Sequence, residues 1–278
     1  MEDEVDIINV AGFREDGRLP HELRKISCKL GVFSEPDGSA FIEQGLTKVL
    51  VAVYGPHQVK ITIHISKASI LSCYFILKPK IKSKSQHDVA VINCQYSTAV
   101  FSSCDRKRRP RGDRKSTEMS LHLRQALSAV IRTDLYPRSQ IDIYFEVLGD
   151  FGGNFSACIN GATLALIDAG IPLQEYLCAC TASIVQNNTT LVDVSRMEEN
   201  IGGPVLTVAC FPESGKIVFM DMSQRFHIDY LKQVLEVAIE GCKSVKKILD
   251  EVVRLHIAEV GSMSGWGKDA AAQMETQT

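Results

Sequence analysis

Residues 140–172 read QIDIYFEVLGDFGGNFSACINGATLALIDAGIP, and this stretch decides the fold class. The β-branched and aromatic run 141–148 predicts a strand, with alternation at its start. The Gly152-Gly153 pair follows, and Asn154 is a favourable N-cap for the Ala-rich segment that stops at Gly170. The small, apolar residues of that segment predict a buried helix. A strand therefore leads through a glycine turn into a core helix.

The segments on either side extend this pattern in both directions. Strands are predicted upstream and downstream, at 40–45, 48–54, 89–97, 178–185, 205–211 and 216–222, and the second of them is expected to stop at Gly55-Pro56. Two amphipathic helices are predicted at 116–133 and at about 229–257 from apolar residues spaced three and four apart. Strands followed by helices, twice over, indicate an α+β chain with two similar halves.

Composition narrows the class of protein. The net charge is −2, hydrophobic residues make up 45% and charged residues 23% of the 278 positions, as in ordinary globular chains. The acidic start lacks the features of a signal peptide, and no run of 18 apolar residues predicts a membrane span. Nine cysteines without C-x-x-C spacing are expected to be reduced, buried thiols of a cytosolic or nuclear protein. No metal site and no cofactor are predicted.

The chain is expected to divide into three parts. Residues 1–11 form an acidic N-terminal tail, 12–258 a single domain, and 259–278 a disordered C-terminal tail. Within the domain, residues at about 58–87 are expected to be an atypical insertion, which ends in lysines at every second position.

Six segments in order resemble the RNase PH family. They are Gly12–Arg18, Asp37–Ala40, Gln44–Val49, Tyr54–Pro56, Pro137–Ile143 and Asp168–Pro172. A further run, Asn93–Ser97 followed by the basic segment 106–116, resembles the RNase PH-like ring subunits of the eukaryotic RNA exosome. The resemblance implies a layered βα fold of the ribosomal protein S5 domain 2 type. It also implies a six-membered ring with RNA-binding cap subunits, which threads single-stranded RNA to an associated nuclease. Active members of the family cleave the 3′ end of RNA with inorganic phosphate.

The phosphate site implied by the family is incomplete in this chain. Gly152-Gly153 at a helix start keeps the exposed N–H groups and the positive end of the helix dipole. Active members follow the two glycines with Thr or Ser and then Arg, whereas this chain has Asn154 and Phe155. Loss of one preorganised donor costs about 10²- to 10³-fold in rate, so negligible phosphorolysis is expected. The alternative interpretation, a helix cap and a packing residue, agrees with an inactive site.

Two carboxylates, Asp193 and Glu199, match the family positions thought to serve acid or metal roles. The second is normally Asp, so Glu199 extends one methylene further. Without the phosphate clamp neither is expected to be catalytic, and the alternative is that both are solvated loop carboxylates.

A basic run follows the strand at 89–97. Its members are Arg106, Lys107, Arg108, Arg109, Arg111, Arg114 and Lys115. A solvated surface or a nuclear localisation patch is one interpretation. RNA binding is the other, because Arg114 and Lys115 fall near a predicted helix start, where cations oppose the dipole unless an anion is present. The family resemblance implies RNA phosphate contacts at these two positions.

Taken with these observations, the resemblance implies a non-catalytic, RNA-binding ring subunit in the nucleus, nucleolus and cytoplasm. Its partners would be other RNase PH-like subunits, cap subunits, a catalytic nuclease and single-stranded RNA, with no membrane or DNA. Its role would be support of 3′-to-5′ RNA processing and decay, including rRNA maturation and turnover of mRNA and noncoding RNA. Two alternatives stay open: an active phosphate-dependent 3′-5′ exoribonuclease, and a purely structural subunit without RNA contact.

Overall fold

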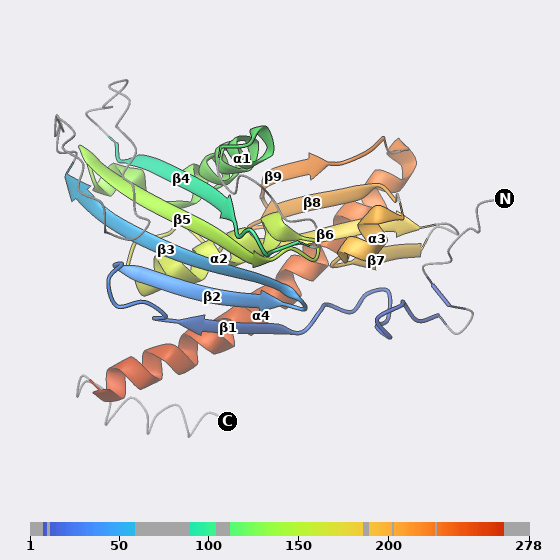
Figure 1. Ribbon diagram of the computed structural model, residues 1–278, viewed down its shortest axis with the longest axis horizontal. Helices are drawn as coiled ribbons and strands as arrows, with labels where there is room; N and C mark the ends of the chain where they lie inside the picture. Colours follow the sequence, from blue (N-terminus) through green and yellow to red (C-terminus); the bar gives the residue numbers. More distant parts are fainter. Residues whose placement is uncertain are drawn as a thin grey trace.

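The computed structural model describes residues 8–9, 12–58, 89–103, 112–185, 189–201, 203–225 and 227–263. The strand and helix bounds below refer to these residues. The predicted insertion lies outside them except for Gln58. Two β-sheets with helices between and around them form the described part of the chain (Figure 1).

The first sheet has the strand order β1-β2-β3-β5-β4 within the described residues. Its strands are β1 (Ile26–Leu30), β2 (Gly38–Gln44), β3 (Thr47–Gln58), β4 (Val91–Thr98) and β5 (Ser139–Gly149). Neighbours run antiparallel except β4 and β5, which are parallel. Val49, Val51 and Val53 point to the fully buried face of β3, as the two-residue period of a strand requires.

The prediction that the strand from 48 stops at Gly55-Pro56 was wrong. β3 continues to Gln58, with a register shift between Tyr54 and His57 that lets pairing with β5 resume beyond the proline. The sequence also gave no prediction for β1, which is short and alternates lysine or serine with apolar residues.

The second sheet has the order β7-β6-β8-β9, and all its neighbours are antiparallel. Its strands are β6 (Cys178–Val185), β7 (Thr189–Val192), β8 (Val205–Cys210) and β9 (Ile217–Met222). The three predicted strands correspond to β6, β8 and β9. The short strand β7 was not predicted.

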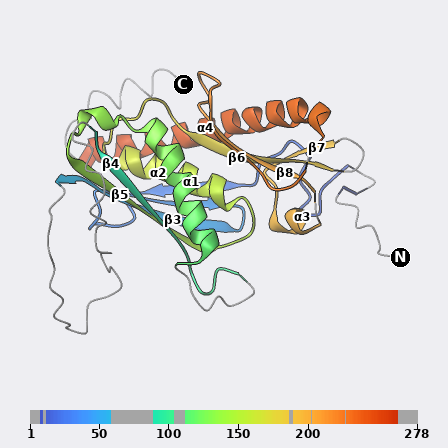
Figure 2. The same ribbon diagram turned by 90° about the horizontal axis from the view of Figure 1, so that it is seen from above.

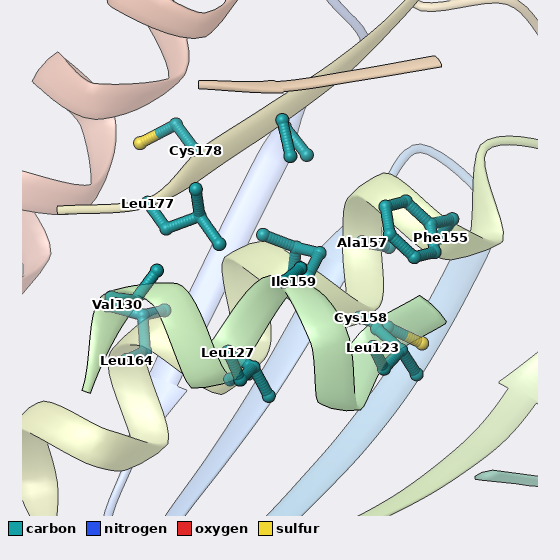
Figure 3. Close-up of a cluster of buried hydrophobic side chains, with 14 of the residues drawn as sticks. Leu123, Leu127, Val130, Phe155, Ala157, Cys158, Ile159, Leu164, Leu177 and Cys178 are labelled. Carbon is teal, nitrogen blue, oxygen red and sulfur yellow. The ribbon is translucent and has the colours of Figure 1, made fainter. Parts of the chain in front are cut away.

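Helix α2 (Asn154–Asp168) lies between the two sheets and packs on β2, β3 and β6. This position explains why the helix is apolar on nearly every side. Gly170 follows it with a φ of 69°, as predicted for a residue just past a helix end. Helix α1 (Arg114–Val130) packs on β4 and α2, and Figure 3 shows Leu123, Leu127 and Val130 within the buried cluster. The predicted apolar face of this helix is confirmed.

The long helix α4 (Ile228–Met263) covers the second sheet along β6 and β8 and reaches β1 (Figure 2). Val234, Ala238, Cys242, Val245 and Leu249 form its buried stripe, as predicted. The predicted disorder from residue 259 was wrong for 259–263, which belong to the helix. Residues 264–278, and most of the predicted 1–11 tail, lie outside the described residues.

One buried cluster includes residues from both sheets and from α1, α2 and α4. The described cysteines are free thiols, and all are buried except the half-buried Cys28. No described helix combines the length and apolarity needed to span a membrane.

Candidate functional site

The glycine turn before α2 has a backbone that other residues adopt poorly. Gly152 and Gly153 have φ angles of 92° and 64°. A Cβ on Gly152 would lie 2.5 Å from the backbone nitrogen of Arg196, and one on Gly153 would lie 2.8 Å from Nη2 of Arg24. Glycine is therefore required at Gly152 by conformation and by space, whereas at Gly153 the positive φ favours glycine and a Cβ would displace only side-chain atoms.

Asn154 does not cap the helix, contrary to the prediction. Gly153 is the N-cap residue and Asn154 is the first helical residue. The Asn154 Nδ2 group donates to Oδ1 of Asp150 (2.6 Å), and the other oxygen of Asp150 pairs with Nη1 of Arg196 (2.7 Å). Asn154 and Arg196 thus share one carboxylate beside the turn.

Phe155 is a packing residue, as one of the two sequence interpretations held. It is 8% exposed, and its ring centroid lies 4.6 Å from that of Phe219 on β9. The Phe219 ring in turn contacts His122 of α1 at 5.1 Å. An aromatic stack therefore fills the place where active family members are expected to have a guanidinium.

Asp193 is fully buried, so its interpretation as a solvated carboxylate was wrong. Its Oδ1 accepts from Nη2 of Arg24 (2.7 Å) and from Nε2 of Gln44 (2.8 Å), and its Oδ2 accepts from the Arg24 backbone N–H (2.9 Å). Burial favours the neutral acid, but the hydrogen bonds and charge of Arg24 outweigh it and lower the pKa of Asp193 overall. The pKa of Arg24 is raised even though burial opposes its charge, because of the same bonds and charge of Asp193.

Two more arginines bind the backbone of Asp193. The carbonyl oxygen of Asp193 accepts from Nη1 of Arg18 (3.3 Å) and, at 3.5 Å, from Nη1 of Arg14. Asp193 has a φ of 55°, a left-handed conformation that aspartate tolerates better than most residues. These arginines belong to the 12–18 motif, so this motif joins the N-terminal segment to the second sheet.

Arg24 also links Asp193 to the glycine turn. Its guanidinium donates to the carbonyl oxygens of Phe151 (3.3 Å) and Gly152 (3.3 Å from Nη2), and the Gly152 oxygen also accepts from the Thr47 hydroxyl (2.8 Å). The carboxylate of Asp193 is shielded from solvent. It neutralises Arg24, whose guanidinium hydrogen-bonds the carbonyl oxygens of the glycine turn.

Glu199 lies on the other side of the turn. It belongs to the short helix α3 (Arg196–Asn200), and its Oε1 accepts from the backbone N–H of Gly153 (3.3 Å). Burial raises the pKa of Glu199, the Asp150 charge raises it further, and the Gly153 N–H, Arg24 and Lys115 oppose the increase. Glu199 also lines an open groove of about 270 Å³ with Thr207 of β8 and Asp221 of β9.

The two described members of the basic run are the first residues of α1. Arg114 and Lys115 are both exposed, no acidic side chain occupies the first turn, and Asp113 makes no side-chain cap bond. Their predicted position at a helix start is confirmed. The positive charge of Lys115 is among the influences that oppose the increase in the pKa of Glu199. Arg106, Lys107, Arg108, Arg109 and Arg111 lie outside the described residues.

Sequence reasoning missed the role of Arg24, which stands alone in the segment HELRK and has no motif to mark it. It also missed α3, although Ser195 and Glu198 have the spacing of a capping box and form one in the structure. Among the described residues, no three His, Cys, Asp or Glu side chains are placed to hold a metal ion.

Comparison with known proteins identifies the family. Models of the 3′ exoribonuclease family match residues 22–172 as domain 1, RNase_PH, and residues 175–241 as domain 2, RNase_PH_C. This chain belongs to the RNase PH family. The two matched segments meet within the region 12–258 that the sequence predicts to be one domain.

Similar relatives span nearly the whole chain. Exosome complex component RRP41 of Bos taurus is 47% identical over 261 residues, which cover 94% of this chain and 98% of the relative. The Homo sapiens protein of the same name is 46% identical over the same shares of both chains. Exosome complex component Rrp41 of Thermoplasma acidophilum is 34% identical over 92% of this chain and 96% of its own length.

Two solved structures share the fold. Rice (Oryza sativa) Rrp46 has a TM-score of 0.70 at 20% identity, with 85% of this chain and 98% of that chain covered. A chain of the Archaeoglobus fulgidus exosome, solved with RNA bound to the active site, has a TM-score of 0.67 at 20% identity, with 85% and 92% covered. The expected RNase PH-like layered fold is therefore confirmed.

Proposed function

We propose that this chain is a ring subunit of an RNA exosome that contacts RNA and does not catalyse phosphorolysis. Its high identity to RRP41 proteins over almost the whole of both chains supports the assembly. Its partners are then other RNase PH-like subunits, cap subunits and a nuclease, located in the nucleus, nucleolus and cytoplasm. Its role is in 3′-to-5′ RNA processing and decay.

The absence of phosphorolysis is supported above all by Phe155, which stands where active family members are expected to have the arginine of the phosphate clamp. Phe155 is buried against Phe219, so its ring has no charge to offer a phosphate dianion. The two arginines at the turn are already paired, Arg24 with Asp193 and Arg196 with Asp150, and the Glu199 carboxylate at the Gly153 N–H repels an anion. The two retained glycines supply N–H groups, but backbone donors alone lack the bidentate cation that binds phosphate strongly.

The RNA contact is supported by Arg114 and Lys115 at the exposed start of α1. Two cations at the positive end of a helix dipole are unfavourable in isolation and are stabilised by a bound polyanion. Contacts to phosphates do not depend on base sequence, as a subunit that passes any single strand requires.

The catalytic question is tested by supplying labelled single-stranded RNA and inorganic phosphate to the ring assembled without its associated nuclease. No phosphate-dependent release of nucleoside diphosphates by this chain is expected. Release that disappears when Gly153 is replaced by alanine, in a variant that still assembles into the ring, would instead establish the active exoribonuclease.

The RNA contact is tested with the double substitution Arg114→Glu and Lys115→Glu in the assembled ring. RNA affinity should fall. The plot of log affinity against log salt should become less steep, by about 1.4 in the magnitude of its slope, if two phosphate contacts are lost. The matched control is Lys243→Glu with Lys247→Glu, which reverses two exposed charges on α4. If the Arg114/Lys115 variant binds RNA and protects it from degradation as well as the Lys243/Lys247 control does, the result would favour the purely structural subunit.

A further inference from the structure

The two residues that replace the family's phosphate clamp, and the carboxylate beside them, all have partners inside this chain. Asn154 bonds Asp150, Phe155 stacks on Phe219, and Glu199 accepts the Gly153 N–H. Although Glu199 also lines the open groove, its carboxylate oxygen occupies one of the donors that an anion at the turn would use.

We propose that Glu199 is an internal substitute for the phosphate anion, and that α3 acts as a strap which keeps the glycine turn closed to external anions. This inference rests on the proposed non-catalytic function and deepens it. It assigns the loss of phosphate binding to occupation of the turn by Glu199 in addition to loss of the clamp.

The strap is fixed to the turn at several points. The backbone N–H of Arg196 donates to the carbonyl oxygen of Phe151 (3.0 Å), and the Arg196 side chain pairs with Asp150 (2.7 Å). The capping box between Ser195 and Glu198 holds the first turn of α3 in shape. The Arg196 backbone lies so near Gly152 that a Cβ there would collide with it.

The surroundings of Glu199 act on its charge in both directions. Burial and the Asp150 charge raise the pKa of Glu199 overall, whereas the Gly153 N–H, Arg24 and Lys115 favour its charged form. The proposal therefore rests on the position of the carboxylate oxygen at the Gly153 N–H. The additional methylene of glutamate relative to aspartate gives the carboxylate the reach that the bond to Gly153 uses. A phosphate that entered the turn would have to displace this carboxylate or lie beside it.

The test compares Glu199→Gln and Glu199→Ala with the wild-type chain, each in the assembled ring. Glutamine keeps an oxygen acceptor but removes the charge, whereas alanine removes both. Glu251→Ala, at an exposed position on α4, is the matched control for loss of a carboxylate. Binding of inorganic phosphate is followed by 31P line broadening, without RNA, so that only this site differs between the samples.

Phosphate affinity is expected to increase from wild type to glutamine to alanine, by at least about tenfold in total, because a competing charge and then a competing acceptor are removed. Hydrogen exchange at residues 150–156 should accelerate in the alanine variant and in the glutamine variant to a smaller degree, and not in the control. Equal phosphate affinity in all four proteins, whether zero or measurable, would overturn the proposal. That result would leave the non-catalytic function standing, since the latter fails only if the wild-type chain releases nucleoside diphosphates.

Discussion

Replacing Asp193 by asparagine tests the buried ion pair with Arg24. Asparagine has nearly the same volume as aspartate and also tolerates the left-handed backbone found there, so packing and backbone strain stay almost constant. The change removes the negative charge while the guanidinium, 6% exposed in the folded chain, stays buried.

The expected loss of folding free energy follows from the three hydrogen bonds that the Asp193 carboxylate accepts, at 2.7, 2.8 and 2.9 Å. One oxygen of the carboxylate becomes an NH2 group, so a donor then faces a donor. Breaking a fully buried pair by removing one partner costs about 3–5 kcal/mol. The free energy of unfolding in urea, followed by circular dichroism, should decrease by this amount at neutral pH.

The control is Glu213→Gln, which removes the charge from an ion pair with Lys246 in which the glutamate is 68% exposed. Solvent screening limits its effect to at most about 1 kcal/mol. The double variant Asp193→Asn with Arg24→Met should cost less than the sum of the single changes, because each single change strands the other partner. A decrease below about 1 kcal/mol for Asp193→Asn, or additive single costs, would refute the assignment of Asp193 as a structural anion.

Three further predictions concern the same region. The pKa of Asp193 in the folded chain lies below its ordinary value, so the stability that its charge contributes is present above about pH 4 and is lost as the pH falls through the folded pKa. The asparagine variant has no such carboxylate, so its free energy of unfolding should not show this loss at acidic pH. Gly152→Ala should lower the free energy of unfolding by about 1–3 kcal/mol more than Gly215→Ala, since both glycines have positive φ but a Cβ has free space only at Gly215. Phe155→Ala should lower the thermal midpoint through a loss of about 3 kcal/mol, whereas Phe101→Ala, at a side chain 75% exposed, should leave it unchanged.

The parts of the fold that sequence predicted are those with a strong local period. The buried face of α1 and the stripe of α4 follow from residues three and four apart, and α2 follows from its run of small apolar residues that ends at Gly170. β7 has four residues and α3 has five, which is too short for a period to appear. The end of α4 was misplaced because its last turn exposes its apolar side chains, as Val260 shows, so no inward stripe marks it as helix.

The site was less predictable because its contacts join distant parts of the chain. Arg24 and Asp193 are 169 residues apart, and Gly153 and Glu199 are 46 apart. The family resemblance marked Asp193 and Glu199 as candidate acids, but the sequence carries no sign that Asp193 is buried and that Glu199 bonds the Gly153 N–H. Only the packing of the second sheet against the N-terminal segment separates these two roles.

This separation changes what a retained acidic residue means at the site. Asp193 neutralises a buried arginine and so supports the glycine turn whether or not any reaction takes place there. Its presence is therefore equally compatible with an active and an inactive chain. Positions 155 and 199 distinguish an inactive chain from an active one. At 155 a buried phenylalanine ring replaces the cation, and at 199 the longer glutamate carboxylate reaches the Gly153 N–H. A substitution that restores only the cation at 155 would leave Glu199 in place, and removal of Glu199 alone would leave the cation missing, so full recovery of phosphate binding should require changes at both positions.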